Sequence, residues 1–268
     1  MKVGVFDSGM GGLIVTHSII QELPQYDYLF LGDTARVPYG SRSPEAIYRF
    51  TKEGVRYLFQ QDCEIVIVAC NTASADALRH LQQDYLPEEY PDCHLLGVLV
   101  PTAEAAVAAS HNHQIGVLAT EGTVASGAFE REIHKLQPDA QVLQQAAPLL
   151  VPLVEYSGSA YAPAILRDYL KPLLAAGVDT LVLGCTHYPF FRDEIKKQVG
   201  EQVKVIGQDE LMPRRLADYL QRHPETEQLL SRAATRSFVV TDLTPSNQAL
   251  ASLLFDATAN LKPVSLVA

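Results

Sequence analysis

Two cysteines are placed in the same way by the sequence, and together they point to proton-transfer chemistry. Cys70 follows the apolar run 65–68 and Cys185 follows the apolar run 180–183, so each thiol lies where a buried strand would end. A helix N-terminus after such a strand lowers the pKa of a thiol from its reference of about 8.5. Two thiols on opposite sides of a ligand are suited to removing a proton from carbon and delivering one to the opposite face.

Other thiol chemistries fit the sequence less well. A zinc site or a redox dithiol would favour a C-x-x-C spacing, which the chain lacks. A nucleophilic cysteine would need one thiol and one base rather than two matching thiols. Cys63 and Cys93 have no comparable surroundings, and we predict that both are structural. We therefore predict no metal site.

The composition indicates a cytoplasmic globular protein. The chain has 268 residues, of which 47% are apolar, and its formal net charge is −10 from 21 basic and 31 acidic residues. This balance argues against a nucleic-acid or anionic-membrane surface, because both need clustered Lys and Arg. No apolar run approaches the ~20 residues of a membrane span, and Asp7 comes too early for a signal peptide. We predict a cytoplasmic location with free thiols.

Short apolar runs alternate with helical patterns, which is typical of parallel sheets covered on both faces. The predicted strands are 3–6, 28–31, 65–68, 95–99, 114–119, 141–143, 180–183, 203–206 and 237–241. The predicted helices are 13–23, 43–61, 74–83, 103–110, 126–136, 161–176, 192–199, 210–223 and 246–260, with 148–155 as an apolar-lined loop. The fold class is α/β, with two doubly wound, mainly parallel domains related by a faint pseudo-repeat.

Each predicted domain carries one of the paired cysteines. We assign residues 1–97 and 208–268 to the first domain and 98–207 to the second, with the active site in the cleft between them. A ligand of parallel sheets lies beyond the carboxyl ends of their strands. The polar clusters at such ends are Asp7–Ser8, Asp33, Cys70–Asn71–Thr72, Thr120–Thr123 and Cys185–Thr186–His187. Their convergence predicts one shared site.

The glycine-rich turn Asp7–Gly12 matches neither common phosphate-binding template. The dinucleotide fingerprint requires G-x-G-x-x-G and the P-loop ends in G-K-[ST], so a dinucleotide-binding protein is disfavoured. The segment is either a tight strand-to-helix turn or a loop in which Asp7 faces the ligand while backbone N–H groups bind a carboxylate. His187, two residues from Cys185, is placed to polarise that thiol, and Glu155 is a candidate buried carboxylate.

Six short segments, taken in order, carry a family resemblance. They are DSGMGG at 7–12, PYG at 38–40, ACNTA at 69–73, TEGT at 120–123, PLVE at 152–155 and GCTHYP at 184–189. Together they resemble glutamate racemases of the cofactor-independent aspartate/glutamate racemase superfamily, over residues 3 to about 207. The part from Gln208 carries little recognisable pattern. The resemblance implies interconversion of L- and D-glutamate without pyridoxal phosphate or metal, which supplies D-glutamate for peptidoglycan.

The resemblance also implies a role for each candidate site residue. Cys70 would deprotonate D-glutamate with the assistance of Asp7. Cys185 would deprotonate L-glutamate with the assistance of Glu155 and His187. The residues that would hold the substrate are Asp7, Ser8, Pro38, Tyr39, Gly40, Asn71, Thr72, Thr120, Thr123, Thr186 and His187.

Two other functions stay open on the sequence alone. An aspartate racemase would use the same two-thiol chemistry on a shorter side chain. A non-catalytic relative would bind a small acidic ligand without turnover. In each case we expect a small-molecule ligand and neither a nucleic-acid nor a membrane partner. Because a homodimer is common among the relatives that the chain resembles, we also predict a homodimer.

Overall fold

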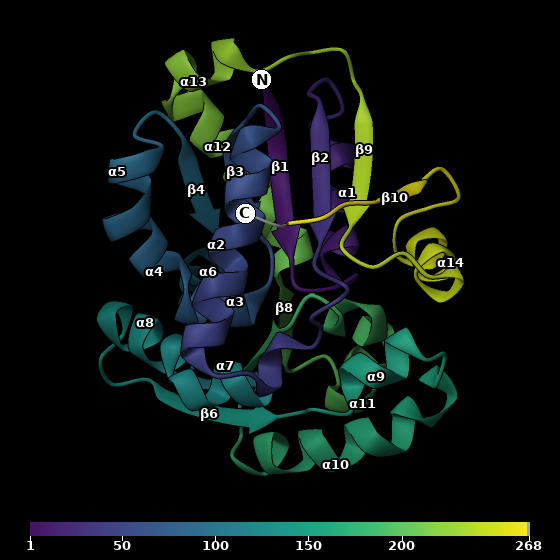
Figure 1. Ribbon diagram of the computed structural model, residues 1–268. Coiled ribbons are helices and arrows are strands. Elements are labelled where there is room, and N and C mark those ends of the chain that lie inside the picture. The colour runs from purple at the N-terminus through teal and green to yellow at the C-terminus, as the bar shows by residue number, and fades with distance from the viewer. Residues whose placement is uncertain (267–268) are drawn as a thin grey trace.

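Two parallel β-sheets form the centre of the protein, whose computed structural model describes residues 1–266 (Figure 1). The first sheet has the strand order β10–β9–β2–β1–β3–β4 and the second has the order β6–β5–β7–β8. Every pairing between the described strands is parallel. The strands are β1 (Lys2–Asp7), β2 (Tyr28–Gly32), β3 (Cys63–Val68), β4 (His94–Gly97), β5 (Gln114–Ala119), β6 (Gln141–Ala146), β7 (Thr180–Gly184), β8 (Lys204–Gly207), β9 (Arg236–Val240) and β10 (Leu261–Pro263).

The two sheets share one core topology, which is the structural form of the predicted pseudo-repeat. The order β2–β1–β3–β4 in the first sheet is matched by β6–β5–β7–β8 in the second. The predicted class of two doubly wound, parallel α/β units is therefore confirmed. Strands β9 and β10, from the C-terminal part of the chain, extend the first sheet beside β2. The domain limits at 97/98 and 207/208 stay predictions.

Helices flank the sheets (Figure 1). The α-helices are α1 (Gly12–Glu22), α2 (Pro44–Gln60), α3 (Asn71–Asp76), α4 (Leu78–His80), α5 (Leu86–Glu89), α6 (Leu99–Ala109), α7 (Glu121–Ser126), α8 (Ala128–Leu136), α9 (Leu150–Glu155), α10 (Ala162–Ala175), α11 (Arg192–Val199), α12 (Gln208–Arg222), α13 (Pro224–Leu229) and α14 (Pro245–Leu254). The shorter turns are η1 (Tyr39–Ser41), the π-helical η2 (Leu81–Tyr85), η3 (Ser159–Tyr161) and η4 (Tyr188–Phe191). None of the helices within residues 1–266 has the length and apolar character of a membrane-spanning segment.

Strand alternation divides the core of the first sheet between its two faces. Phe6 and Val68 belong to a buried cluster with apolar residues of α2. Val5 and Ile67 point the other way, into a cluster with apolar residues of α1 and α12. Because both faces are covered, the central strands are apolar along their whole length. This is the reason why they were recognisable in the sequence.

The start of α2 shows how local sequence sets an element. Ser43 Oγ accepts a hydrogen bond from the Ala46 N–H at 3.3 Å, and Pro44 occupies the first turn. A serine cap satisfies one of the free N–H groups of a helix, and proline loses nothing there because its missing N–H would have no partner. The predicted helix over 43–61 is confirmed within one residue at each end.

Several other local predictions were wrong. Residues 148–155 are not a loop, because α9 occupies most of them, with Pro152 in its first turn where N–H groups need no intrahelical partner. The helix predicted over 126–136 is α8 and begins two residues later, at Ala128, while the predicted turn at 120–123 lies at the start of a separate helix, α7, which Gly127 in the left-handed region at φ +60° divides from α8. Glycine adopts that conformation without steric cost.

Two further helices differ in extent. The helix predicted over 74–83 begins earlier, because Cys70 caps α3 at Asn71, and helical turns continue through η2 and α5. The helix predicted over 246–260 ends at Leu254, and the short strand β10 follows it.

Gly54 in α2 allows this helix to lie directly against Phe6 of β1. An alanine Cβ at position 54 would be 2.3 Å from Phe6 Cε2. We expect Gly54→Ala to lower the free energy of unfolding by about 1–3 kcal/mol, although alanine is the better helix former. Urea unfolding followed by circular dichroism measures this loss. Gly116→Ala is the matched control, because its Cβ would meet its nearest atoms at 3.4 Å; an equal loss in both variants would contradict the packing argument.

Candidate active site

A small cavity lies between the carboxyl ends of the two sheets and collects most of the candidate residues. Its volume is about 20 Å³, room for about one water molecule. The residues that line it are Ser8, Val37, Pro38, Tyr39, Gly40, Cys70, Asn71, Thr72, Thr120, Val151, Cys185, Thr186 and His187. Cys70 follows β3 of the first sheet and Cys185 follows β7 of the second. Both predicted thiols therefore face one enclosure.

On the first-sheet side, Cys70 is the N-cap of α3. Its Sγ accepts a hydrogen bond from the Ala73 N–H at 3.4 Å, and its thiol donates to Ser8 Oγ at 3.2 Å. Burial, together with the negative charge of nearby Asp7, raises the pKa of the Cys70 thiol to about 12. Cys70 is therefore a protonated thiol at neutral pH, and the capping N–H does not overcome its burial.

Asp7 stands behind Cys70 at the end of β1 and is fully buried. The Gly9 N–H donates to its Oδ2 at 3.1 Å. Burial raises the pKa of Asp7, whereas the positive charge of His187 and the hydrogen bond from Gly9 lower it. The carboxyl group does not line the cavity, so it acts on the site through its neighbours.

On the second-sheet side, Cys185, His187 and Glu155 form a chain of contacts. Cys185 Sγ lies 3.9 Å from His187 Nδ1, and His187 Nε2 lies 3.0 Å from Glu155 Oε1. Burial disfavours charge on His187, but the contacts with Cys185 and Glu155 outweigh it and raise its pKa to about 10. His187 is therefore an imidazolium at neutral pH, held between a sulfur and a carboxylate.

Three threonine hydroxyls connect the two halves across the cavity. Thr72 Oγ1, at the start of α3, lies 2.9 Å from Thr120 Oγ1 and 3.2 Å from Thr123 Oγ1. Thr120 also caps α7 by accepting from the Thr123 N–H at 3.2 Å. Beside them, the Asn71 side chain is 2% exposed, and neither its oxygen nor its nitrogen has a hydrogen-bond partner among residues 1–266. A buried amide without partners marks a position for a polar ligand group.

Two glycines permit close approach around the cavity. A Cβ at Gly11 would lie 2.5 Å from His187 Nδ1 and 2.6 Å from Thr186 Oγ1, so the glycine-rich turn packs against the second half of the site. A Cβ at Gly40 would lie 2.8 Å from Thr120 Cβ. Of the two alternatives left open for this turn, the tight strand-to-helix connection is present, with Asp7 at its base.

Most predicted site residues are brought together, although three stand behind the lining. Asp7, Glu155 and Thr123 each contact lining residues without facing the cavity. The sequence did not identify Val37 and Val151, which line the cavity, because apolar residues carry no chemical signal. Asp33 was recognised only as a strand-end carboxylate, and Thr241, which donates to it at 2.8 Å, was missed.

Cavity size alone would have favoured another place. A cavity of about 690 Å³ lies among α3, α4, α6, α8 and α12, and none of the predicted site residues lines it. Within residues 1–266, no group of three or more His, Cys, Asp or Glu side chains is arranged to hold a metal ion. The site is assigned to the smaller cavity because the titratable side chains converge there.

The fold and this convergence define an α/β enzyme with its site between two parallel-sheet domains. A family model described as Asp/Glu/Hydantoin racemase matches residues 3–208. The chain therefore belongs to the Asp/Glu/hydantoin racemase family, and it is an isomerase.

Individual relatives agree with this assignment. The chain is 42% identical over 243 residues to a glutamate racemase of Geobacter metallireducens, covering 90% of this chain and 87% of that one. It superposes on a glutamate racemase isoform of Bacillus anthracis with a TM-score of 0.89 at 34% identity, covering 99% and 97% of the two chains. For a Francisella tularensis glutamate racemase in complex with D-glutamate the TM-score is 0.87 at 28% identity, with coverage of 99% and 97%. The predicted resemblance to glutamate racemases is confirmed.

The charge on His187 predicts a pH-dependent contribution to stability. A folded-state pKa of about 10, above the ordinary 6.5, means that the folded protein holds this proton more tightly. The contribution is full below about pH 6.5 and is lost as the pH rises through about 10. We expect the difference in unfolding free energy between wild type and His187→Gln to shrink over this window, as measured by urea unfolding. His80→Gln, at a largely exposed histidine, is the control; a difference that did not change with pH would contradict the assignment.

Proposed function

We propose that this protein interconverts L- and D-glutamate by a two-base mechanism in which Cys70 and Cys185 are the acid/base groups. One observation carries the proposal: the two thiols, delivered by strands of different sheets, line the same cavity. The relatives named as glutamate racemases support the substrate, and one of their structures holds D-glutamate.

In this mechanism the two thiols begin in different protonation states. His187 Nδ1 lies 3.9 Å from Cys185 Sγ, so its imidazolium would stabilise the thiolate that removes the Cα proton, while Cys70 carries its proton. The Cys185 thiolate removes the Cα proton of L-glutamate, and the Cys70 thiol then delivers its own proton to the opposite face. The product is D-glutamate, with Cys185 protonated and Cys70 a thiolate. The reverse reaction starts from that second state.

The neighbouring charged groups support the two half-reactions. Glu155 holds His187 in place and stabilises its charge through the 3.0 Å contact. Asp7 acts on the Cys70 side, where its raised pKa allows it to share a proton with the site when Cys70 becomes a thiolate. Each group thus acts through a thiol or through its partner, in agreement with their positions behind the cavity lining.

Substrate binding would use uncharged hydrogen-bond groups. The Asn71 side-chain amide has no hydrogen-bond partner within residues 1–266, so it can both donate and accept, and it lines the same cavity as Thr72 and Thr120. Such groups bind carboxylates and stabilise the charge that develops next to Cα when the proton leaves. The other cavity-lining residues that we propose to contact the substrate are Ser8, Pro38, Tyr39, Gly40, Thr186 and His187. Thr123 would act on the substrate through its bonds with Thr72 and Thr120.

The size of the cavity adds a conformational step. A volume of about 20 Å³ is far too small for an amino acid. Substrate must therefore separate the two halves, and the halves must close again to exclude water from the reacting thiolate.

We propose further that the product serves peptidoglycan synthesis and that the protein acts as a homodimer in the cytoplasm. The rival functions are an aspartate racemase and a non-catalytic binder of an acidic ligand. Steady-state kinetics on both amino acids separates the first, since faster turnover of L-aspartate would overturn the choice of substrate. A binder would show no turnover of either enantiomer.

Removing either thiol should abolish racemisation without removing binding. We expect Cys70→Ser and Cys185→Ser to lower kcat by roughly 10²–10⁴-fold in both directions, because general acid–base catalysis contributes that much. Circular dichroism of the product measures the rate, and calorimetry measures glutamate affinity. Cys93→Ser, at a free cysteine outside the cavity lining, is the control. Full activity in either site variant would rule out the two-base scheme.

Solvent deuterium should enter the product before it enters the substrate. Starting from either enantiomer in D₂O, the product gains deuterium at Cα because the second thiol delivers a solvent-derived proton. Residual substrate should gain little at early times, because the first thiol returns only the proton that it removed. Mass spectrometry of the separated enantiomers measures both. Equal labelling of substrate and product from the start would indicate a single base.

A further inference from the structure

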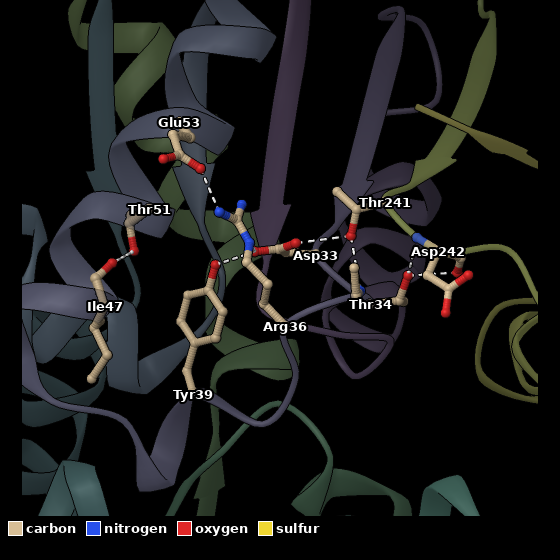
Figure 2. A network of polar contacts seen from close by, with 10 residues as sticks. Asp33, Thr34, Arg36, Tyr39, Ile47, Thr51, Glu53, Thr241 and Asp242 are labelled. Atoms are coloured by element: carbon tan, nitrogen blue, oxygen red, sulfur yellow. Dashed lines mark hydrogen bonds and ion pairs between the residues drawn. The ribbon is translucent and has the colours of Figure 1, made fainter. Parts of the chain in front are cut away.

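Asp33, at the carboxyl end of β2, lies at the centre of a polar network (Figure 2). Its side chain is fully buried. Its Oδ2 accepts from Tyr39 Oη at 2.5 Å and from Arg36 Nε at 2.7 Å. Its Oδ1 accepts from Thr241 Oγ1 at 2.8 Å. Arg36 in turn pairs with Glu53 of α2. One buried carboxylate thus joins β2, α2 and the end of β9.

Thr241 forms two contacts with a single hydroxyl group. Its Oγ1 donates to Asp33 and accepts from the Ala35 N–H at 2.9 Å. The next residues along both segments exchange a second pair of bonds: Thr34 Oγ1 donates to the Asp242 carbonyl at 2.6 Å, and the Asp242 N–H donates back at 2.9 Å. Four hydrogen bonds therefore fasten the C-terminal part of the chain to the segment that follows β2.

That segment, residues 34–41, is here called the substrate loop because it carries Pro38, Tyr39 and Gly40 into the cavity lining. Tyr39 faces the cavity and also donates to Asp33. Burial and the Asp33 charge raise the pKa of Tyr39, so its phenol stays protonated and remains a donor. Gly40 packs against Thr120 of the other half without room for a Cβ. A small shift of this loop would therefore alter both the lining and the contact across the cleft.

We propose that Thr241, which directly follows β9, is a positioning residue for the substrate loop and sets the affinity for substrate, acting through Asp33 and through its direct bond with the Ala35 N–H. A buried carboxylate that loses one of its donors is left partly unsatisfied. Asp33 then holds Tyr39 and the backbone of the loop less firmly. Part of the free energy of substrate binding is then used to order the loop, which weakens the affinity. The inference rests on the proposed function, because it concerns the binding of the substrate that the cavity receives.

Thr241→Val is the direct test, since valine keeps the shape of threonine and removes the hydroxyl. We expect KM for both enantiomers to rise about tenfold, as for a lost hydrogen bond to a charged group, while kcat changes by less than about twofold because no group that touches the reacting atoms is altered. Thr241→Ser keeps the hydroxyl and should restore KM.

Thr51→Val is the matched control. Thr51 is fully buried in the same region, but its hydroxyl donates to the Ile47 carbonyl within α2 at 2.7 Å (Figure 2). A merely structural role for Thr241 would lower stability in both variants and leave KM unchanged in both. Equal KM values for Thr241→Val and Thr51→Val would overturn the proposal.

Hydrogen exchange tests the loop without reference to activity. The Arg36 N–H donates to the Asp33 carbonyl at 3.1 Å and the Arg42 N–H donates to the Tyr39 carbonyl at 2.9 Å, so these amides report on the loop. We expect them to exchange faster in Thr241→Val and to be unchanged in Thr51→Val. Unchanged exchange in both would contradict the proposal even if KM moved.

A double-mutant cycle tests the route through Asp33. Tyr39→Phe removes the other hydroxyl donor to this carboxylate, so its effect on loop exchange should be non-additive with that of Thr241→Val. Strict additivity would show that the two act independently.

If Thr241→Val does not fold, loop exchange in Tyr39→Phe alone tests the role of Asp33, and unchanged exchange in that variant would overturn it. If the wild-type protein does not racemise glutamate, the proposed function is wrong. The hydrogen-exchange measurements would still test whether Thr241 and Asp33 hold the loop in place.

Discussion

Every pairing between the described strands is parallel, and this shared direction determines where the candidate site residues lie. When strands of a sheet run in one direction, the residues that follow them are collected at one edge. Asp7, Cys70 and the substrate loop leave the first sheet at that edge, and Cys185 leaves the second sheet at the edge that faces it. The candidate site residues therefore need no dedicated element, because the turns that end the strands supply them. The same constraint buries both faces of the strands and gives them their continuous apolar character.

The two sides of the cavity are alike in topology but different in charge. Cys70 has a carboxyl group behind it, whereas Cys185 has an imidazolium backed by a carboxylate. Since the two enantiomers of an amino acid have equal free energy in water, this difference cannot favour either product at equilibrium. Under the proposed mechanism, the difference can only decide which protonation state the free protein adopts and which enantiomer that state deprotonates.

The sequence predicted those parts of the fold that are determined by residues close together in the chain. The buried strands, the cap at Ser43 and the small polar residues after Cys70 and Cys185 are visible within a few neighbours. The helix α9 was missed because a short apolar run near a proline fits a loop as well as a helix. Thr241 was missed for a different reason: it meets Asp33 across 208 positions of the chain, and nothing in its own surroundings signals a buried carboxylate elsewhere.

The three threonine hydroxyls that join the halves of the cavity weaken the binding of any ligand that must displace them. Thr72, Thr120 and Thr123 satisfy one another when the cleft is closed on itself. Under the proposed function the Thr72 and Thr120 hydroxyls, which line the cavity, receive the substrate, so a ligand must first displace hydrogen bonds that the protein makes with itself. The hydrogen bonds among the threonines thus compete with the ligand for the same hydroxyls. The measured association constant for the ligand equals the intrinsic constant multiplied by the fraction of molecules in which these threonine–threonine bonds are broken.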